Sequence, residues 1–189
     1  AGDEGEVAGP RCGKEKRVCT VVIASAEAIA DSVRVSAIRA RGEIIEAPAK
    51  GTSVGTFCRN ALACAAALKT IEIMERDHLA ERSCQIGETV MKRYNEWKEK
   101  YEVVGDVRGL GGMVGIEFVK SKETKEPAPE FTAALVHDCA MHGLIVESAG
   151  TYSNVIRFLA PLVITDEQLE AGLAIMEQAI VRCMSGQTK

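Results

Sequence analysis

Apolar residues recur at helical spacing in the middle of the chain. Residues 60–75, NALACAAALKTIEIME, combine strong helix formers with alanine on every face, which predicts a largely buried helix. A second helix is expected from about residue 77 to residue 100, with charged residues on one side. Its other side is apolar and contains Leu79, Ile86, Val90, Met91 and Trp97.

Two further helices are predicted nearer the C-terminal end. Residues 131–142 have helical character and are followed by Gly143, which suits a left-handed C-terminal cap. Thr165 and Gln168 stand at the spacing of a capping box, in which each side chain binds the other residue's backbone N–H group. Apolar residues then follow at alternating intervals of four and three, so this helix is expected to pack on a core. They are Leu169, Leu173, Met176, Ile180 and Cys183.

Short β-branched and apolar runs between these helices predict strands. The RGLGG stretch at residues 108–112 is expected to join two of them, because glycine tolerates turn conformations that other residues resist. The expected strands are residues 18–23, 33–38, 103–107, 113–119, 144–147 and 155–159.

Composition narrows the choice of partners. The chain has 189 residues, of which 47% are hydrophobic and 26% charged, and a net charge of −4. Without a block of Lys and Arg, neither nucleic acid nor an anionic membrane is expected as the main partner. No apolar run approaches the roughly 18 to 20 residues of a membrane helix, and no signal-peptide core is recognised. We therefore expect a cytoplasmic protein whose partners are small molecules or proteins.

The seven cysteines predict neither a disulfide framework nor a metal site. Their number is odd and no C-x-x-C pair occurs, so we expect reduced thiols. The pairs at positions 12 and 19 and at positions 58 and 64 are too widely spaced for a zinc site.

Four sequence motifs occur in an order typical of one enzyme family: NALACAAAL, VRGLGGMVGIEFV, GLIV and NVIRFLAPLVIT. Residues 52–184 resemble the C-terminal part of class III pyridoxal-phosphate aminotransferases, most of all those acting on 4-aminobutyrate. The resemblance implies a homodimer of fold type I and an α/β chain. Residues 1–58 would be a degenerate remnant of the large cofactor-binding domain. Residues 59–189 would be the small domain, with helices on a short, mainly antiparallel sheet, including the long connecting helix.

The same resemblance assigns cofactor-binding roles to two residues. Asp3, in DEGE, stands where the family has the aspartate that pairs with the pyridine nitrogen. Thr56, in GTFCRNA, stands where a threonine hydroxyl binds the cofactor phosphate. From the residues alone, the favoured reading of Asp3 is a solvated acid and that of Thr56 is a cap of the helix that follows.

Two more positions decide the chemistry. Glu27, in AEA, occupies the place of the family's Schiff-base lysine, and a carboxylate cannot form an imine with the cofactor aldehyde. No catalytic residue is therefore assigned. Arg157, in NVIRF, matches the arginine that binds the substrate carboxylate by a bidentate pair. An internal glutamate is the alternative partner for Arg157.

The resemblance implies transfer of an amino group from an ω-amino acid such as 4-aminobutyrate to 2-oxoglutarate, with pyridoxal 5'-phosphate as cofactor. Less than half of a family member is present, and Glu27 replaces the lysine, so we expect the chain to be inactive alone. Two alternatives stay open: a non-catalytic scaffold that oligomerises, and a carboxylate-binding module that uses Arg157.

Overall fold

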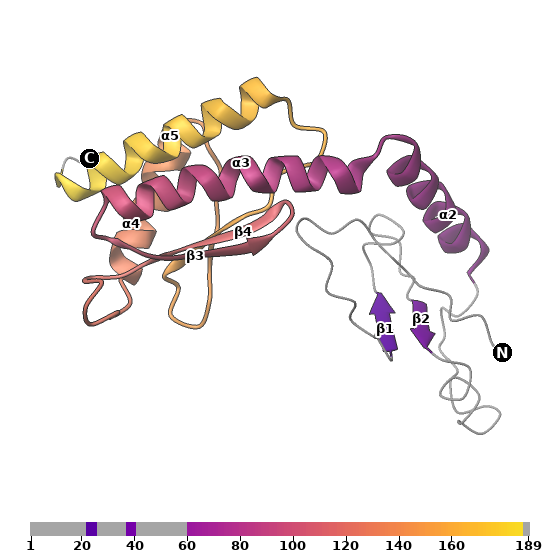
Figure 1. Cartoon of the computed structure of the whole chain (residues 1–189), viewed down its shortest axis with the longest axis horizontal. Coiled ribbons are helices and arrows are strands. Elements are labelled where there is room, and N and C mark those ends of the chain that lie inside the picture. Colours follow the sequence, from indigo (N-terminus) through magenta and orange to yellow (C-terminus); the bar gives the residue numbers. More distant parts are fainter. Residues whose placement is uncertain (1–21, 26–36, 41–59, 187–189) are drawn as a thin grey trace. The chain divides into compact units, whose positions relative to one another are not determined.

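The structure is a computed structural model that describes residues 22–25, 37–40 and 60–186 (Figure 1). The chain divides into two compact units, one of residues 13–79 and one of residues 1–12 and 80–189. Each unit is described by itself.

The first unit contains a two-stranded antiparallel sheet and one helix. Strand β1 (Val22–Ser25) pairs with β2 (Ala37–Ala40) so that Val22 lies opposite Ala40. Both strands overlap the C-terminal ends of the two expected runs and extend two residues beyond them.

Helix α2 (Ala61–Arg76) begins at an asparagine. The Oδ1 atom of Asn60 accepts hydrogen bonds from the backbone N–H groups of Leu62 and Ala63, at 3.0 and 3.2 Å. These bonds satisfy two amide donors that the first turn of a helix leaves without partners. The cap of α2 is therefore Asn60 and not Thr56.

The expectation that this helix is largely buried is wrong for the described residues. Only Ala63 and Ala67 are buried in α2, whereas Leu62 is 72% exposed and Leu68 is 70% exposed. The physical reason is that alanine favours a helix through its low side-chain entropy cost, whether or not the helix is covered. A high alanine content therefore predicts the helix but not its burial.

The second unit packs three helices on one antiparallel sheet (Figure 1). The strand order is β3-β4-β6-β5. The elements are α3 (Leu79–Lys100), β3 (Val104–Leu110), β4 (Met113–Phe118), α4 (Pro129–Met141), β5 (Ser148–Ala149), β6 (Val155–Phe158) and α5 (Asp166–Met184). This arrangement confirms the expected α/β fold with helices on a short antiparallel sheet.

The core lies between the helices and the inner face of this sheet. Each large aliphatic or aromatic side chain fully buried here stabilises the fold by roughly 1.5–3 kcal/mol. The apolar faces expected for α3 and α5 are confirmed, with Leu79, Met91 and Cys183 only partly buried. The core contains Ile86, Val90, Tyr94, Trp97, Val104, Val114, Ile116, Phe118, Leu135, Cys139, Ile156, Leu169, Leu173, Met176, Ala179 and Ile180.

The β3–β4 hairpin packs tightly on α3 through glycines. Gly111 has a φ of +53°, and the N–H group of Gly112 donates to Ser83 Oγ at 2.8 Å. A Cβ atom at Gly87 of α3 would lie 2.1 Å from the carbonyl oxygen of Gly111, so only glycine permits this approach. The turn needs only two residues, and β3 therefore extends further than expected.

The expected strand at residues 144–147 is absent from the structure. The Leu144 N–H group instead donates to the Cys139 carbonyl at 2.9 Å, just after Gly143 adopts a φ of +86°. The segment thus closes the C-terminal end of α4, and the edge strand β5 follows it. Leu144 packs against the core and is partly buried, but Ile145 is 89% exposed.

The N-terminal end of α5 confirms the expected capping box. The Gln168 N–H group donates to Thr165 Oγ1 at 3.2 Å, and the Thr165 N–H group donates to Gln168 Oε1 at 3.1 Å. Asp166 in the first turn of α5 also pairs with Arg82 of α3, at 2.8 Å. A cap of this kind stabilises a helix by about 1 kcal/mol.

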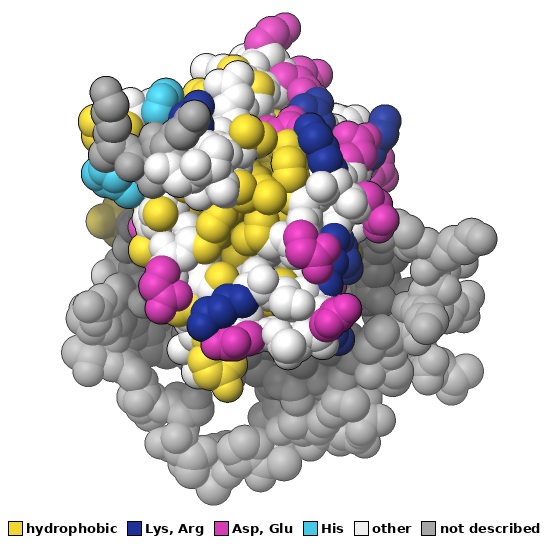
Figure 2. All heavy atoms as spheres, turned by 90° about the vertical axis from the view of Figure 1, so that its left-hand side faces the viewer, with side chains coloured by type: hydrophobic (Ala, Val, Ile, Leu, Met, Phe, Trp, Pro, Cys, Tyr) yellow, Lys and Arg dark blue, Asp and Glu magenta, His cyan; other side chains and the backbone are white. Residues whose placement is uncertain are grey.

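Apolar side chains are also exposed at the end of the unit where α5 terminates. Figure 2 shows them gathered on this face beside acidic and basic groups. Met141 of α4 is 71% exposed, and Val181 and Met184 of α5 are each 49% exposed. Among the described residues, no helix is long and apolar enough to cross a membrane.

One expectation about the cysteines is wrong. Cys84 takes part in a disulfide bond, whereas Cys64, Cys139 and Cys183 carry free thiols. Spacing along the chain does not report which thiols meet in three dimensions, which explains the error.

Candidate carboxylate-binding site

Arg157 lies on the outer face of the four-stranded sheet, opposite the face that the helices cover. It pairs with Gly115 across β4 and β6, and Gly115 in turn pairs with Arg108 across β3 and β4. Side chains of directly paired residues project from the same face of a sheet. Arg108, Gly115 and Arg157 therefore form one row across three strands, and both arginines are exposed.

Arg157 forms no hydrogen bond or ion pair with any residue that the structure describes. The acid nearest to it in the sheet register is Glu117, which lies two residues beyond Gly115 on the same face. Both oxygens of Glu117 are already used. Oε2 accepts from Arg108 at 2.7 Å, and Oε1 accepts from Asn154 at 3.4 Å. An internal glutamate partner for Arg157 is therefore not observed in the described part of the chain.

Arg108 belongs to a chain of alternating charges that links the outer face of the sheet to Lys98 of α3. Its guanidinium also donates to Asp106 Oδ2 at 2.9 Å, and Lys98 pairs with the other Asp106 oxygen at 3.2 Å. The hydrogen bond to Glu117, followed by that to Asp106, raises the pKa of Arg108. Partial burial acts to raise the pKa of Asp106, but its bonds from Arg108 and Lys98 lower it overall. Arg108 and Asp106 are thus held in their charged forms.

An apolar row lies beside the arginine row. Leu110 and Met113 are direct partners across β3 and β4, and Leu159 follows Arg157 by two residues. Their side chains are 70%, 55% and 61% exposed. A free guanidinium binds a carboxylate through two parallel N–H···O bonds, and the adjacent apolar row offers contact to a short aliphatic chain. The outer face is therefore suited to a small carboxylic acid with an apolar body.

The other expected site residues lie outside the described residues. These are Asp3 and Thr56, expected to bind the cofactor, and Glu27, at the lysine position. As a donor set they fit pyridoxal phosphate only in part. An aspartate can pair with the ring nitrogen and a threonine with the phosphate, but a glutamate cannot bond to the aldehyde. These residues therefore do not support a catalytic step through the cofactor.

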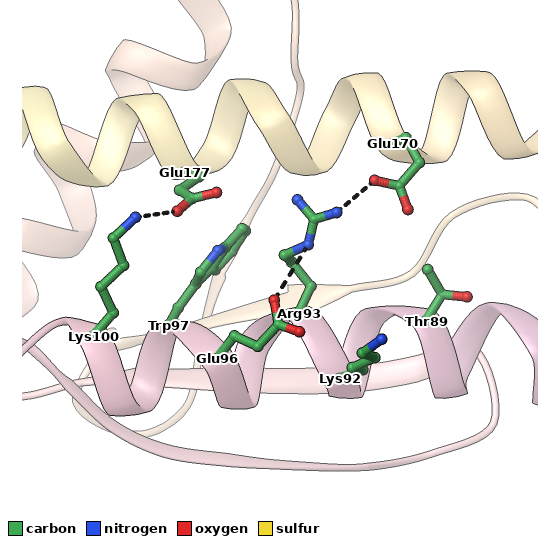
Figure 3. Close-up of a pocket in the computed structure, with 8 residues that line it drawn as sticks. All are labelled: Thr89, Lys92, Arg93, Glu96, Trp97, Lys100, Glu170 and Glu177. Carbon is green, nitrogen blue, oxygen red and sulfur yellow. Dashed lines mark hydrogen bonds and ion pairs between the residues drawn. The ribbon is translucent and has the colours of Figure 1, made fainter.

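A groove between α3 and α5 is a second surface with several charged groups (Figure 3). It has a volume of about 390 Å³. Its charges are largely satisfied in pairs, because Arg93 binds Glu170 at 2.7 Å and Lys100 binds Glu177 at 2.8 Å. The Lys100 ammonium lowers the pKa of Glu177, and no nucleophile with a neighbouring base lines the groove. These contacts serve to hold the two helices together.

Trp97 forms the buried floor of this groove and is 1% exposed. Its Nε1 atom is buried without a hydrogen bond of normal geometry among the described residues. Glu177 lies close enough for the indole N–H group to contribute slightly to lowering the pKa of Glu177. This N–H group therefore lies beside a carboxylate of the protein itself and does not by itself indicate a ligand.

The fold and the site together define an α/β domain that presents, within the part of the chain that the structure describes, an exposed arginine without a partner on the outer face of its sheet. The chain belongs to the class III aminotransferases, because the family model described as "Aminotransferase class-III" matches residues 16–180.

Individual relatives agree with this family. The chain is 42% identical over 153 residues to a 5-aminovalerate aminotransferase of Pseudomonas aeruginosa, covering 81% of this chain and 36% of that protein. It is 43% identical over 155 residues to a 4-aminobutyrate aminotransferase of Mycobacterium tuberculosis, covering 82% of this chain and 34% of that protein. The chain thus spans about a third of the length of these relatives.

Solved structures lead to the same fold. A Bacillus anthracis aminotransferase superposes with a TM-score of 0.79 at 35% identity, over 88% of this chain and 40% of that one. The resemblance to class III aminotransferases, inferred from the four sequence motifs, is therefore confirmed.

Sequence reasoning missed the residues around Arg157. It gave Arg108, Asp106 and Glu117 no part in the site. The signal that could have identified them was alternation along the strands: in MVGIEF every second residue faces away from the core. Pairing the three strands still requires their register, which the sequence does not supply.

Proposed function

We propose that this chain contributes the carboxylate-binding arginine of an aminotransferase that moves an amino group from an ω-amino acid to 2-oxoglutarate. A donor of the 4-aminobutyrate type is supported by the names of the two relatives, which act on 4-aminobutyrate and 5-aminovalerate. The observation that carries the proposal is the exposed, unpaired guanidinium of Arg157 on the outer sheet face.

The surroundings of Arg157 support a linear substrate. Its guanidinium would hold the carboxylate, while the methylene groups would lie against Met113 and Leu159 in the neighbouring row. This row offers no charged group to a second carboxylate, so the short aliphatic body of an ω-amino acid is favoured there.

Pyridoxal 5'-phosphate is the cofactor of this family, and when bound it supplies an electron sink for the amino acid. In this chain, Asp3 and Thr56 would pair with its ring nitrogen and phosphate. Glu27 offers no amine to bond to its aldehyde. We therefore propose that the chain by itself is not a self-sufficient catalyst. Residues 1–58 would belong to the large domain and residues 59–189 to the small domain of a cytoplasmic homodimer.

Calorimetry with 4-aminobutyrate and with 2-oxoglutarate tests the binding role. Both ligands should bind to the chain, and Arg157→Met should abolish the heat of binding. Arg157→Lys should weaken binding because an ammonium lacks the bidentate fork. Arg93→Met is the matched control, since it also removes an arginine from the same unit but breaks the pair with Glu170. Unchanged heats in Arg157→Met would remove the proposed role.

Peptide mapping after treatment with the cofactor and borohydride tests the position of Glu27. The wild-type chain should show no reduced adduct at this position, whereas Glu27→Lys should gain one. Failure of Glu27→Lys to form an adduct under saturating cofactor would contradict the assignment of residue 27 to the lysine position.

A non-catalytic oligomerising scaffold is the second candidate function, and exposed apolar side chains on α2 favour it. Leu62, Leu68, Ile71 and Met74 are between 44% and 72% exposed. Exposed apolar surface of this kind commonly marks an association site. Sedimentation equilibrium should then show a self-associated species that Leu68→Lys dissociates, and a strictly monomeric chain at high concentration would count against it.

A further inference from the structure

We propose that Arg108 is a positioning residue that holds Glu117 away from Arg157 and so keeps the Arg157 guanidinium available for a ligand carboxylate. The identity of that ligand rests on the function proposed above. The competition between the two arginines for Glu117 rests only on the geometry of the sheet.

The sheet register places Glu117 within reach of both arginines. Glu117 pairs with Val155, and Gly115 pairs with Arg157, so Glu117 and Arg157 are diagonal neighbours on one face. Diagonal neighbours in an antiparallel sheet are about 7–8 Å apart, which is within the combined reach of a glutamate and an arginine side chain. Gly115 places no side chain between them. The observed partner of Glu117 is nevertheless Arg108, at 2.7 Å.

The pairing of the charged groups around Arg157 explains why the Arg157 guanidinium has no partner among the described residues. Lys98, Asp106, Arg108 and Glu117 alternate in sign along one chain of contacts and sum to zero. Glu117 is anchored at its other oxygen by Asn154, whose side chain also donates to the Phe118 carbonyl at 2.9 Å. Every acid of the network is thus matched by a cation other than Arg157.

Removal of Arg108 would free Glu117. Its Oε2 atom would lose its charged donor, and Arg157 would become the nearest unpaired cation on the face. A Glu117–Arg157 pair would then occupy the guanidinium edge that a ligand carboxylate needs, because one fork accepts one bidentate partner at a time. Arg108→Met therefore converts a free arginine into a paired one without altering Arg157 itself.

The first experiment measures this pairing without any ligand. Phenylglyoxal modifies free guanidinium groups, and peptide mass spectrometry of the full chain gives the modification rate of Arg157. The rate should fall about two- to fivefold in Arg108→Met, the range expected for a partly exposed ion pair. It should recover in the double variant Arg108→Met/Glu117→Gln, and Arg93→Met, which breaks a pair of the same 2.7 Å length, should not change it.

Glu117→Gln alone keeps the proposal falsifiable if Arg108→Met folds poorly. Because Glu117 is already held by Arg108, this variant should leave the labelling rate of Arg157 unchanged. A faster rate in Glu117→Gln would show that Glu117 pairs with Arg157 in the wild-type chain, and that result would overturn the proposal. An Arg157 rate unchanged in folded Arg108→Met would overturn it as well.

The second experiment uses 2-oxoglutarate as the probe and separates the two proposals. Its dissociation constant should rise about two- to fivefold in Arg108→Met and return in the double variant. Arg108→Lys should keep most of the wild-type affinity, since a lysine can still pair with Glu117. If the wild-type chain binds no 2-oxoglutarate while labelling follows the predicted pattern, the proposed function fails and the role of Arg108 stands.

Discussion

Replacement of Gly87 by alanine is a direct test of the contact between α3 and the β3–β4 hairpin. The added Cβ atom would lie 2.1 Å from the Gly111 carbonyl oxygen and 2.5 Å from its carbonyl carbon. Real Cβ contacts essentially never fall below 3.0 Å, so the hairpin must move by about 0.9 Å (3.0 minus 2.1). Because the obstacle is backbone, no side-chain rotation can relieve it.

The expected cost follows from three contributions. Overpacking of this kind costs about 1–3 kcal/mol. Displacing the hairpin also breaks the 2.8 Å bond from the Gly112 N–H group to Ser83, which adds about 1 kcal/mol. The higher helix propensity of alanine returns about 1 kcal/mol. Gly87→Ala should therefore lower the free energy of unfolding by about 1–3 kcal/mol, and the melting temperature by about 5–20 °C.

Urea unfolding followed by tryptophan fluorescence measures this change in the correct unit, because Trp97 is the only tryptophan and is fully buried in its core. Gly172→Ala in α5 is the matched control. Its Cβ atom would approach only the Leu144 Cδ1 atom, at 3.4 Å, so the gain in helix propensity should leave this variant as stable as wild type or more so. Equal midpoints for the two variants would refute the close approach of α3 and the hairpin.

Three further outcomes are expected, each measured by urea or thermal unfolding. Thr165→Ala should destabilise the second unit by about 1 kcal/mol because it removes the N-terminal cap of α5, and Thr165→Ser should restore most of this. Tyr94→Phe should cost less than about 1 kcal/mol, since the buried hydroxyl binds only the weakly accepting Met176 sulfur at 3.4 Å; a larger loss would mean that the hydroxyl has a stronger partner. The Arg182 guanidinium holds the pKa of Asp138 below its ordinary value, so stability from this pair should be present at neutral pH and be lost as the pH falls below about 4. Arg182→Met should reduce that acid-side loss, and an identical pH profile for the variant would contradict the assignment.

The helices of the second unit could be predicted because their signals are local. The capping box at Thr165 and the apolar spacing of α5 depend on residues within the same helix, and both are confirmed. The strand expected at residues 144–147 failed because an apolar run does not report which backbone groups it binds. There, the Leu144 amide is used to close α4.

The site could be predicted only in part, for the same physical reason. Arg157 was identified from the NVIRF motif, but whether it has an internal partner depends on the side chains of two other strands. Glu117 and Arg108 are assigned to each other by sheet register and by competition between cations. Neither the register nor this competition can be recognised from a short stretch of the sequence. Asp3, Glu27 and Thr56 lie outside the described residues, and their roles stay predictions.

The strand order makes the arginine row depend on a pairing between strands that are distant in the sequence. Strands β3 and β4 form a hairpin from neighbouring residues, but β6 pairs with β4 across the whole of α4 and the segment beyond it. Closing that long loop costs chain entropy before its contacts are gained. The position of Arg157 opposite Gly115 therefore depends on this long-range pairing of β6 with β4. A carboxylate bound across this row would recognise the finished fold alone and shift the folding equilibrium toward it.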